Sequence, residues 1–238
     1  MKIGIISAMP EEAQAILNHA ENLKKSQHGE RSVFYCGIAG HEITLIEAGM
    51  GMLNAGWAAT VLAAQTPDLI ISAGFGGGVL PGLKVGDVVM AEQVLHWAGT
   101  SFERVEAGLY APENTALPIR GCFITSEGIL NKHDLKELLP SNANRPVVEM
   151  EGAAIARVAA EHNIPFMGIR AISDPWNEEL SFSINEFCDD EMRIRPIKVL
   201  TTILQRPHII PQLIRLAWNS RVAARSLSVA TKQLFLQL

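Results

Sequence analysis

Short apolar runs alternate with helical patterns along most of the chain. Runs rich in β-branched residues predict strands at residues 2–7, 33–38, 41–48, 69–73, 88–94, 121–125, 146–149 and 166–172. Apolar residues at helical spacing predict helices at residues 11–22, 52–64, 132–138, 153–162, 184–204 and 209–236. This alternation favours an α/β fold with three αβα layers around a central mixed, mostly parallel β-sheet, in which the strands within 33–48 form an antiparallel pair.

The chain shows no internal boundary between domains. Its 238 residues contain no repeat and no low-complexity linker, and a hydrophobic content of 48% is enough for one large core. We therefore expect a single domain over residues 1–238, with a basic helical extension at about 206–238. Residues 97–118 form the least regular segment, which we interpret as a loop.

Charge is unevenly distributed between the body of the chain and its end. The net charge is -5, but residues 192–238 hold eight basic side chains and no acid, so the preceding residues carry -5 - 8 = -13. Apolar residues within 209–218 lie near helical spacing, which predicts an amphipathic cationic helix. Such a helix either packs on the domain with a solvated basic face or contacts anionic lipid or an amphiphilic substrate. The acidic body makes nucleic acid an unexpected partner.

Cysteine usage and hydropathy indicate the cellular compartment. The three cysteines, Cys36, Cys122 and Cys188, are widely spaced, which is typical of reduced thiols. We expect no signal peptide, because no charged segment followed by an apolar one begins the sequence, and the apolar runs are shorter than the roughly 20 residues of a membrane span. We expect a cytoplasmic protein, with peripheral contact at the inner membrane surface as the alternative that the basic helix raises.

Acidic residues interrupt the apolar pattern at the ends of two predicted strands. Glu149 and Glu151 follow the strand at 146–149, and Asp174 follows the strand at 166–172. Adjacent strand ends form the ligand crevice of open α/β sheets, where a carboxyl group can hold a pair of hydroxyls or transfer a proton. The alternative is that these acids only begin helices, at the positive end of the helix dipole.

Two glycine-rich segments, 49–54 and 74–78, follow predicted strands. Their backbone amides could approach a ligand closely, or the glycines could serve only to make tight turns. Neither segment has the glycine spacing of a dinucleotide site or the Gly-Lys-Ser/Thr of a phosphate loop. Cysteine and histidine pairs at zinc spacing are also missing from the sequence, so we expect no cofactor and no metal.

Several of these segments together resemble a known family. Residues 1–12, 72–78, 83–89, 148–151, 170–174 and 180–182 are similar, in this order, to motifs of 5′-methylthioadenosine/S-adenosylhomocysteine nucleosidases. These enzymes belong to the purine nucleoside phosphorylase superfamily, so the resemblance implies a nucleoside phosphorylase-like fold. It covers residues 1 to about 190, and the tail after residue 199 is similar to that of hopanoid-associated nucleosidases, which remove adenine from adenosylhopane.

The resemblance implies catalytic roles for two acids. Asp174 would donate a proton to N7 of the leaving base, which near neutrality requires that burial raise its pKa. Glu12 would bind and activate the attacking water. Glu151 would accept hydrogen bonds from the ribose 2′- and 3′-hydroxyls and stabilise the cationic sugar.

The resemblance further implies a set of substrate contacts around these acids. Ser173 would orient the acid, Phe123 would stack on the purine, and the backbone at Ile124 would read the base edge. The sugar and its 5′ substituent would be held by neighbouring residues, namely Met150, Met9, Met50 and Phe182, with Glu149, Gly74, Phe75 and Arg170 around them. Phe75 stands where many nucleosidases carry a small or hydroxyl residue, which would reshape the sugar side.

The leading hypothesis is hydrolysis of the N-glycosidic bond of 5′-modified adenine nucleosides of the methylthioadenosine/adenosylhomocysteine type, with release of adenine. Segments 49–54 and 74–80 contain no Arg, Lys, Ser or Thr to hold phosphate, which favours water over phosphate as the nucleophile. The alternatives are hydrolysis of an adenosylhopane-type lipid nucleoside or futalosine, a phosphate-dependent phosphorylase, and a non-catalytic nucleoside-binding protein at membranes. The resemblance also implies a homodimer in which partner loops complete the 5′ pocket.

Overall fold

The computed structural model describes residues 1–112, 119–128, 131–178, 184–187, 189 and 196–238. In these residues the strands are β1 (Lys2–Ser7), β2 (Glu21–His28), β3 (Arg31–Ile38), β4 (His41–Glu47), β5 (Leu69–Gly78), β6 (Val88–Trp97), β7 (Phe102–Arg104), β8 (Ile119–Thr125), β9 (Val147–Glu149) and β10 (Phe166–Asp174). The helices are α1 (Pro10–Leu17), α2 (Met52–Ala63), α3 (Lys132–Leu138), α4 (Gly152–Glu161), α5 (Pro196–Gln205) and α6 (Ile210–Phe235), with short 3-10 turns η1 (Ile184–Phe187) and η2 (Pro207–Ile209).

All these strands join one mixed sheet in the order β10-β6-β8-β9-β5-β1-β4-β3-β2, with β7 paired to β6. Parallel pairings hold β1 between β4 and β5, and the antiparallel pair β3–β4 forms the predicted hairpin. β10 pairs with β5 on one side and with β6 on the other, so β5, β10, β6, β8 and β9 close into a ring. The carboxyl ends of the parallel strands β5 and β10 therefore lie together, and the short strand β9 pairs antiparallel with the end of β5 at Gly77 and Gly78.

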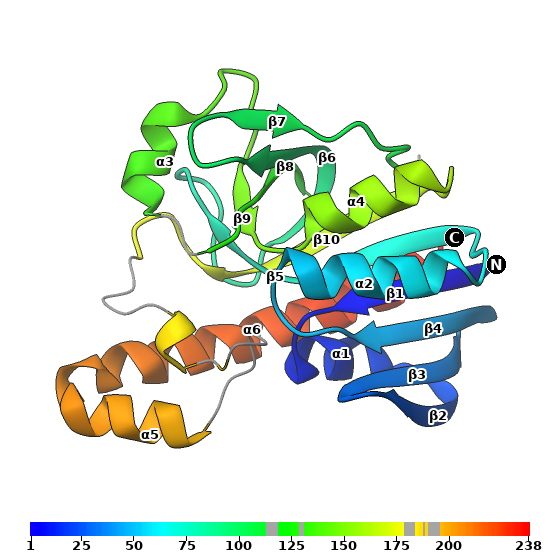
Figure 1. Ribbon diagram of the computed structural model, residues 1–238, viewed down its shortest axis with the longest axis horizontal. Coiled ribbons are helices and arrows are strands. Elements are labelled where there is room, and N and C mark those ends of the chain that lie inside the picture. The colour runs from blue at the N-terminus through cyan, green and yellow to red at the C-terminus, as the bar shows by residue number, and fades with distance from the viewer. Residues whose placement is uncertain (113–118, 129–130, 179–183, 188, 190–195) are drawn as a thin grey trace.

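Helices cover both faces of the sheet (Figure 1). Ile3 and Ile5 of β1 pack with Ile16 of α1 and Leu227 of α6 on one face. On the other face, Ile6 packs with side chains of α2 and α4. Because successive strand residues point to opposite faces, one apolar strand contributes to both cores. The predicted mixed α/β fold with a central sheet and flanking helices is confirmed.

The edge strand β2 is absent from the sequence prediction, which instead extended the first helix to residue 22. Helix α1 ends at Leu17, and β2 begins at Glu21. Every residue of β2 is exposed, so the strand has no alternation of apolar and polar positions that could predict it. Its Lys24 and Lys25 are typical of edge strands, where charge discourages pairing with other chains. The short strand β7 was also missed.

The second glycine-rich segment is a strand and not a turn, which corrects the sequence prediction. β5 continues through Gly78, with Arg170 of β10 paired to Gly74 and Val148 of β9 paired to Gly77. A Cβ atom added at Gly76 would lie only 2.6 Å from Cγ1 of Val147. The glycines therefore let neighbouring side chains approach β5 closely.

Helix α6 has an outer first part and a packed second part. Ile214 and Trp218 are 66% and 65% exposed, whereas Ala223, Leu227 and Leu234 are buried against the sheet. Of the two alternatives for the C-terminal helix, packing on the domain therefore describes the second part of α6. The predicted helix at 184–204 is represented by η1 and α5, and residues 188 and 190–195 lie outside the described residues. A search of the described helices finds none that is both long and apolar enough to cross a membrane.

Replacing Leu227 with alanine tests this packing. Leu227 is fully buried, so the cavity left by Leu227→Ala is expected to lower the free energy of unfolding by about 2–5 kcal/mol. Ile214→Ala, on the exposed part of the same helix, is the control and should change it by less than about 0.5 kcal/mol. Urea denaturation measures both, and equal small effects would contradict the packing of α6 on the sheet.

Candidate active site

A cavity of about 560 Å³ opens where β5, β9 and β10 end. The first turn of α1 and residue Met50 form one side of it, and α6 forms another. Its acidic lining residues are Glu11, Glu12, Glu149, Glu151 and Asp174, and its basic lining residues, among those described, are Lys132 and Arg221. The volume falls within the usual range of small-molecule sites.

Glu12 lies in the first turn of α1 with its carboxylate folded back onto the helix start. Oε2 accepts hydrogen bonds from the backbone amides of Ala8 (2.8 Å) and Met9 (2.9 Å), and Oε1 accepts one from Phe75 (2.7 Å). Gly74 makes room, because a Cβ there would lie 2.7 Å from Oε1. Burial raises the pKa of Glu12 above its ordinary value, although these amides and the charge of Arg170 act in the opposite direction.

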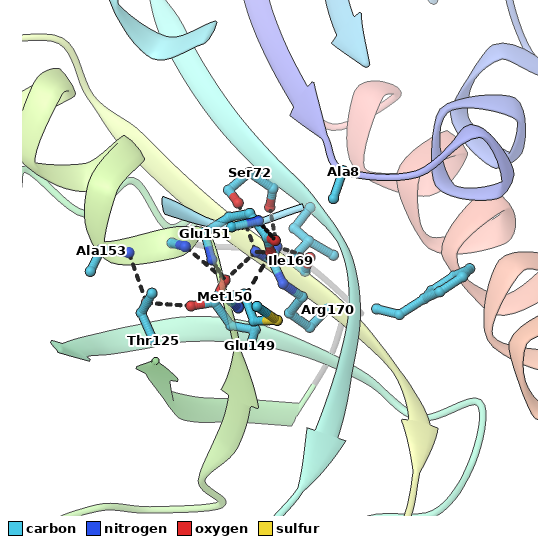
Figure 2. Close-up of polar contacts among 12 residues, drawn as sticks. Ala8, Ser72, Thr125, Glu149, Met150, Glu151, Ala153, Ile169 and Arg170 are labelled. Atoms are coloured by element: carbon cyan, nitrogen blue, oxygen red, sulfur yellow. Dashed lines mark hydrogen bonds and ion pairs between the residues drawn. The ribbon is translucent and has the colours of Figure 1, made fainter. Parts of the chain in front are cut away.

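Arg170 and Glu149 form a buried ion pair at the cavity wall, in which Glu149 lines the cavity and Arg170 lies behind it (Figure 2). The Arg170 guanidinium donates to Glu149 Oε2 at 2.5 Å and to Ser72 through its hydroxyl (2.9 Å) and its carbonyl (3.1 Å). Glu149 also accepts hydrogen bonds from the Thr125 hydroxyl and from the amide of Gly152 (2.7 Å). The two charges are thus paired with each other within the protein, and of the Arg170 nitrogens only the buried Nε has no hydrogen-bond partner among the described residues.

Glu151 stands immediately before α4 and faces the cavity. Its Oε1 accepts a hydrogen bond from the Gly51 amide at 2.9 Å, and its Oε2 lies 3.7 Å from the Arg170 guanidinium. Burial, and then the negative charge of Glu149, raise the pKa of Glu151 to about 7, with Arg170 acting against them. The carboxyl group can therefore change its ionisation near neutral pH.

Asp174, at the end of β10, is held by two side chains. The Ser173 hydroxyl donates to its Oδ1 at 2.8 Å, and Oδ2 forms an ion pair with the Lys132 ammonium. Gly77 permits this approach, because a Cβ there would collide with Oδ2. Its side chain is 25% exposed, so the buried carboxyl expected from the sequence is not what the structure shows.

Most of the residues predicted from the sequence line the cavity, namely Met9, Glu12, Met50, Phe75, Glu149, Met150, Glu151, Ser173 and Asp174. Gly74 and Arg170 lie behind this wall, where Gly74 makes room for Glu12 and Arg170 holds Glu149. Phe182 lies outside the described residues.

The structure does not bring Phe123 and Ile124, the expected base contacts, to the cavity. Both residues are fully buried within β8, and neither lines the cavity. The Phe123 ring packs where Gly168 has no side chain, with the Arg170 guanidinium carbon 5.5 Å from its centroid. The residues of this segment that line the cavity follow the end of β8, and they are Ser126 and Gly128.

Two parts of the cavity wall were not predicted. Lys132 begins the predicted helix α3, but no pattern in the sequence relates it to Asp174. The C-terminal region contributes Phe187, Val199, Leu213, Leu216, Ala217, Ser220, Arg221 and Ala224. Helical spacing predicted the apolar stripe of α6, but spacing alone could not predict that part of this stripe faces the cavity.

The chemistry of the cavity is that of carboxyl groups. Across the ranges described above, no group of three or more His, Cys, Asp or Glu side chains is arranged to hold a metal ion. Glu12, Glu151 and Asp174 face one cavity in different surroundings: backbone amides, other charges and an ammonium group. Carboxyl groups that differ in this way are suited to separate acid, base and charge-stabilising roles.

Comparisons with known proteins agree on one family. Residues 2–205 match the model of a family described as the phosphorylase superfamily. The 5′-methylthioadenosine/S-adenosylhomocysteine nucleosidase of Listeria welshimeri is 33% identical over 214 residues, covering 79% of this chain and 92% of that protein. The enzyme of the same name from Haemophilus influenzae is 31% identical over 211 residues, with the same coverage of 79% and 92%.

Solved structures show the same architecture. A 5′-methylthioadenosine/S-adenosylhomocysteine nucleosidase from S. pneumoniae with the transition-state inhibitor MT-ImmA has a TM-score of 0.73 at 23% identity, covering 100% of this chain and 99% of that one. The futalosine hydrolase of Helicobacter pylori has a TM-score of 0.72 at 16% identity, covering 100% and 98%. These likenesses support the fold.

The raised pKa of Glu151 predicts a pH dependence of stability. The folded protein keeps a proton on Glu151 up to about pH 7, whereas the unfolded chain loses it near the ordinary value of 4.5. The contribution of this group to the free energy of unfolding is therefore full below about pH 4.5 and is lost as pH rises through about 7. Urea denaturation should show that the free energy of unfolding of wild type, minus that of Glu151→Gln, falls as pH rises from about 4.5 to about 7. A difference that stays constant or rises with pH would contradict the assignment, and Glu161→Gln, at an exposed site on α4, is the control.

Proposed function

This chain belongs to the phosphorylase superfamily, and we propose that it is a nucleosidase that hydrolyses the N-glycosidic bond of 5′-modified adenine nucleosides and releases adenine. Methylthioadenosine and adenosylhomocysteine are the substrates named for its relatives of 31–33% identity. The observation that carries the proposal is that Glu12, Glu151 and Asp174 line one cavity.

In the proposed reaction each acid has its own task. The Asp174 carboxyl group, which must carry a proton in the reacting complex, donates that proton to N7 of the purine, so that adenine leaves as a neutral molecule. The sugar becomes cationic as the bond breaks, and Glu151 holds its hydroxyls and stabilises that charge. Glu12 takes a proton from water while the water oxygen bonds to C1′ of the sugar. Burial raises the pKa of Glu12 above its ordinary value, which makes its carboxylate a stronger base and supports this role.

Water is the proposed nucleophile because the two cations beside the cavity acids, Arg170 and Lys132, are already bonded to protein groups. Arg170, nearest the glycine-rich strand, is bonded to Glu149 and Ser72. Lys132 is paired with Asp174. Phosphate binding needs free cationic or hydroxyl groups, and these two side chains do not supply them.

Helix α6 favours a second candidate substrate, a nucleoside with a large apolar 5′ group of the adenosylhopane type. Leu213, Leu216 and Ala217 of α6 line the cavity, and Ile214 and Trp218 beside them are exposed. Apolar surface that runs from a cavity to the outside is suited to an amphiphilic ligand. The same surface, with Arg215 and Arg221 nearby, supports peripheral membrane contact.

We also propose a homodimer in the cytoplasm. The dimer follows from the resemblance to the nucleosidases, while α6 of the same chain already forms one wall of the cavity. The buried free thiols of Cys36 and Cys122 are compatible with a reducing compartment. Analytical ultracentrifugation of the purified protein tests the dimer, and a single species of monomer mass would contradict it.

Removing either catalytic acid tests the reaction. Purified protein is incubated with methylthioadenosine, adenosylhomocysteine, adenosine and inosine, with and without phosphate, and the released base and sugar are identified. Adenine and a free sugar should appear without phosphate. Asp174→Asn and Glu12→Gln should each lower kcat by about 10²–10⁴. The matched controls Asp134→Asn and Glu161→Gln, at exposed sites, should not. Full activity in either catalytic variant would disprove its role, and dependence on phosphate would favour a phosphorylase.

A polar side chain in the α6 wall tests the second candidate. Leu213→Gln should impair turnover of a nucleoside with a long apolar 5′ chain by about tenfold, since one buried leucine side chain contributes roughly 1.5–3 kcal/mol. It should leave methylthioadenosine turnover nearly unchanged. Ile214→Gln, at the exposed neighbouring position, is the control. If wild type does not release adenine from such a nucleoside, the second candidate is wrong.

A further inference from the structure

Lys132 is a buried cation in direct contact with the proposed catalytic acid. Its side chain is 8% exposed, and it lines the cavity together with Asp174. The ammonium donates to Asp174 Oδ2, to the Asp174 carbonyl (3.2 Å) and to the Pro175 carbonyl (2.9 Å). All three of its N–H groups are thus used on two consecutive residues.

The position of Lys132 is unfavourable for the helix that carries it. Lys132 is the first residue of α3, and the N-terminus of a helix is the positive end of its dipole. Asn131 already caps this end, with its side chain accepting from the amides of His133 (2.8 Å) and Asp134 (3.2 Å). Burying an ammonium group there costs free energy unless partners compensate it. The groups that compensate this cost, the Asp174 carboxylate and the carbonyls of Asp174 and Pro175, lie at the end of β10 and just after it, and not on α3.

The turn after Asp174 is held from a second side as well. Glu178 is buried, and its carboxylate accepts from Arg215 Nε (2.5 Å) and from the Asn219 side chain (3.3 Å) of α6. Lys132 therefore fixes the beginning of the segment 174–178, and α6 fixes its end. Between these attachments both oxygens of the Asp174 carboxyl group are contacted, Oδ1 by the Ser173 hydroxyl and Oδ2 by the Lys132 ammonium.

We propose that Lys132 is a positioning residue for the glycosidic cleavage, which sets the orientation of the Asp174 carboxyl group toward the leaving base. This inference rests on the proposed function. A proton donor must meet N7 within hydrogen-bonding distance, so a small rotation of the carboxyl group is costly to the rate. Lys132 acts through Asp174, and it leaves the binding of the sugar and its 5′ substituent to other residues.

The test separates orientation of the acid from general damage to the site. Lys132→Met removes the ammonium group and keeps an unbranched side chain, and Lys136→Met, at an exposed site on the same helix, is the matched control. Two quantities are compared: kcat with methylthioadenosine, and the Kd of its 7-deaza analogue, which lacks the N7 atom that the acid must meet. Lys132→Met should lower kcat by about tenfold or more and leave this Kd within about twofold. Lys136→Met should change neither.

The other outcomes are equally decisive. An unchanged kcat in Lys132→Met, or a parallel loss of kcat and of affinity for the analogue, would overturn the proposal. If Lys132→Met does not fold, Lys132→Gln, which keeps an N–H donor for the two carbonyl groups, is measured in the same way. Failure of both to fold would make Lys132 a structural residue only. Absence of adenine release by wild type would instead refute the proposed function.

Discussion

Arg170 brings a positive charge into the interior of the sheet, where Glu149 and Ser72 hold it. The two charged side chains are 2% and 0% exposed, and loss of one partner from such a pair typically costs about 3–5 kcal/mol. The pair connects β10 to β9 and β5, the strands whose ends form the cavity. Because Glu149 also accepts from the amide of Gly152, the same contact fixes the start of α4.

The surroundings of the three cavity acids follow from this contact. Glu151 lines the same cavity two residues after Glu149, and its pKa responds to burial and to the charges of Glu149 and Arg170. Glu12 approaches from α1 and is bonded to the amide of Phe75 on β5. Asp174 ends the strand that carries Arg170, with Ser173 and Lys132 on its two oxygens. One ring of strands thereby brings carboxyl groups from distant parts of the chain to a single cavity.

The sequence predicted much of this arrangement because the interior strands are apolar and the acids stand at their ends. It could not predict β2, whose residues are all exposed, or the true length of β5, where glycines suggest a turn. It also could not show that Phe123 is buried in the core, because an apolar residue near a strand end can face either the core or a ligand. Lys132 and the α6 wall arise from contacts between distant segments, which local patterns do not contain.

The central claim is that this cavity breaks the bond between adenine and ribose with water. The most direct measurement is one round of turnover of methylthioadenosine in water labelled with heavy oxygen, without phosphate, followed by mass spectrometry of both products. The account predicts that the label appears in the released sugar and that adenine carries none. Absence of adenine release, or release only after phosphate is added, with a sugar phosphate as product, would contradict it.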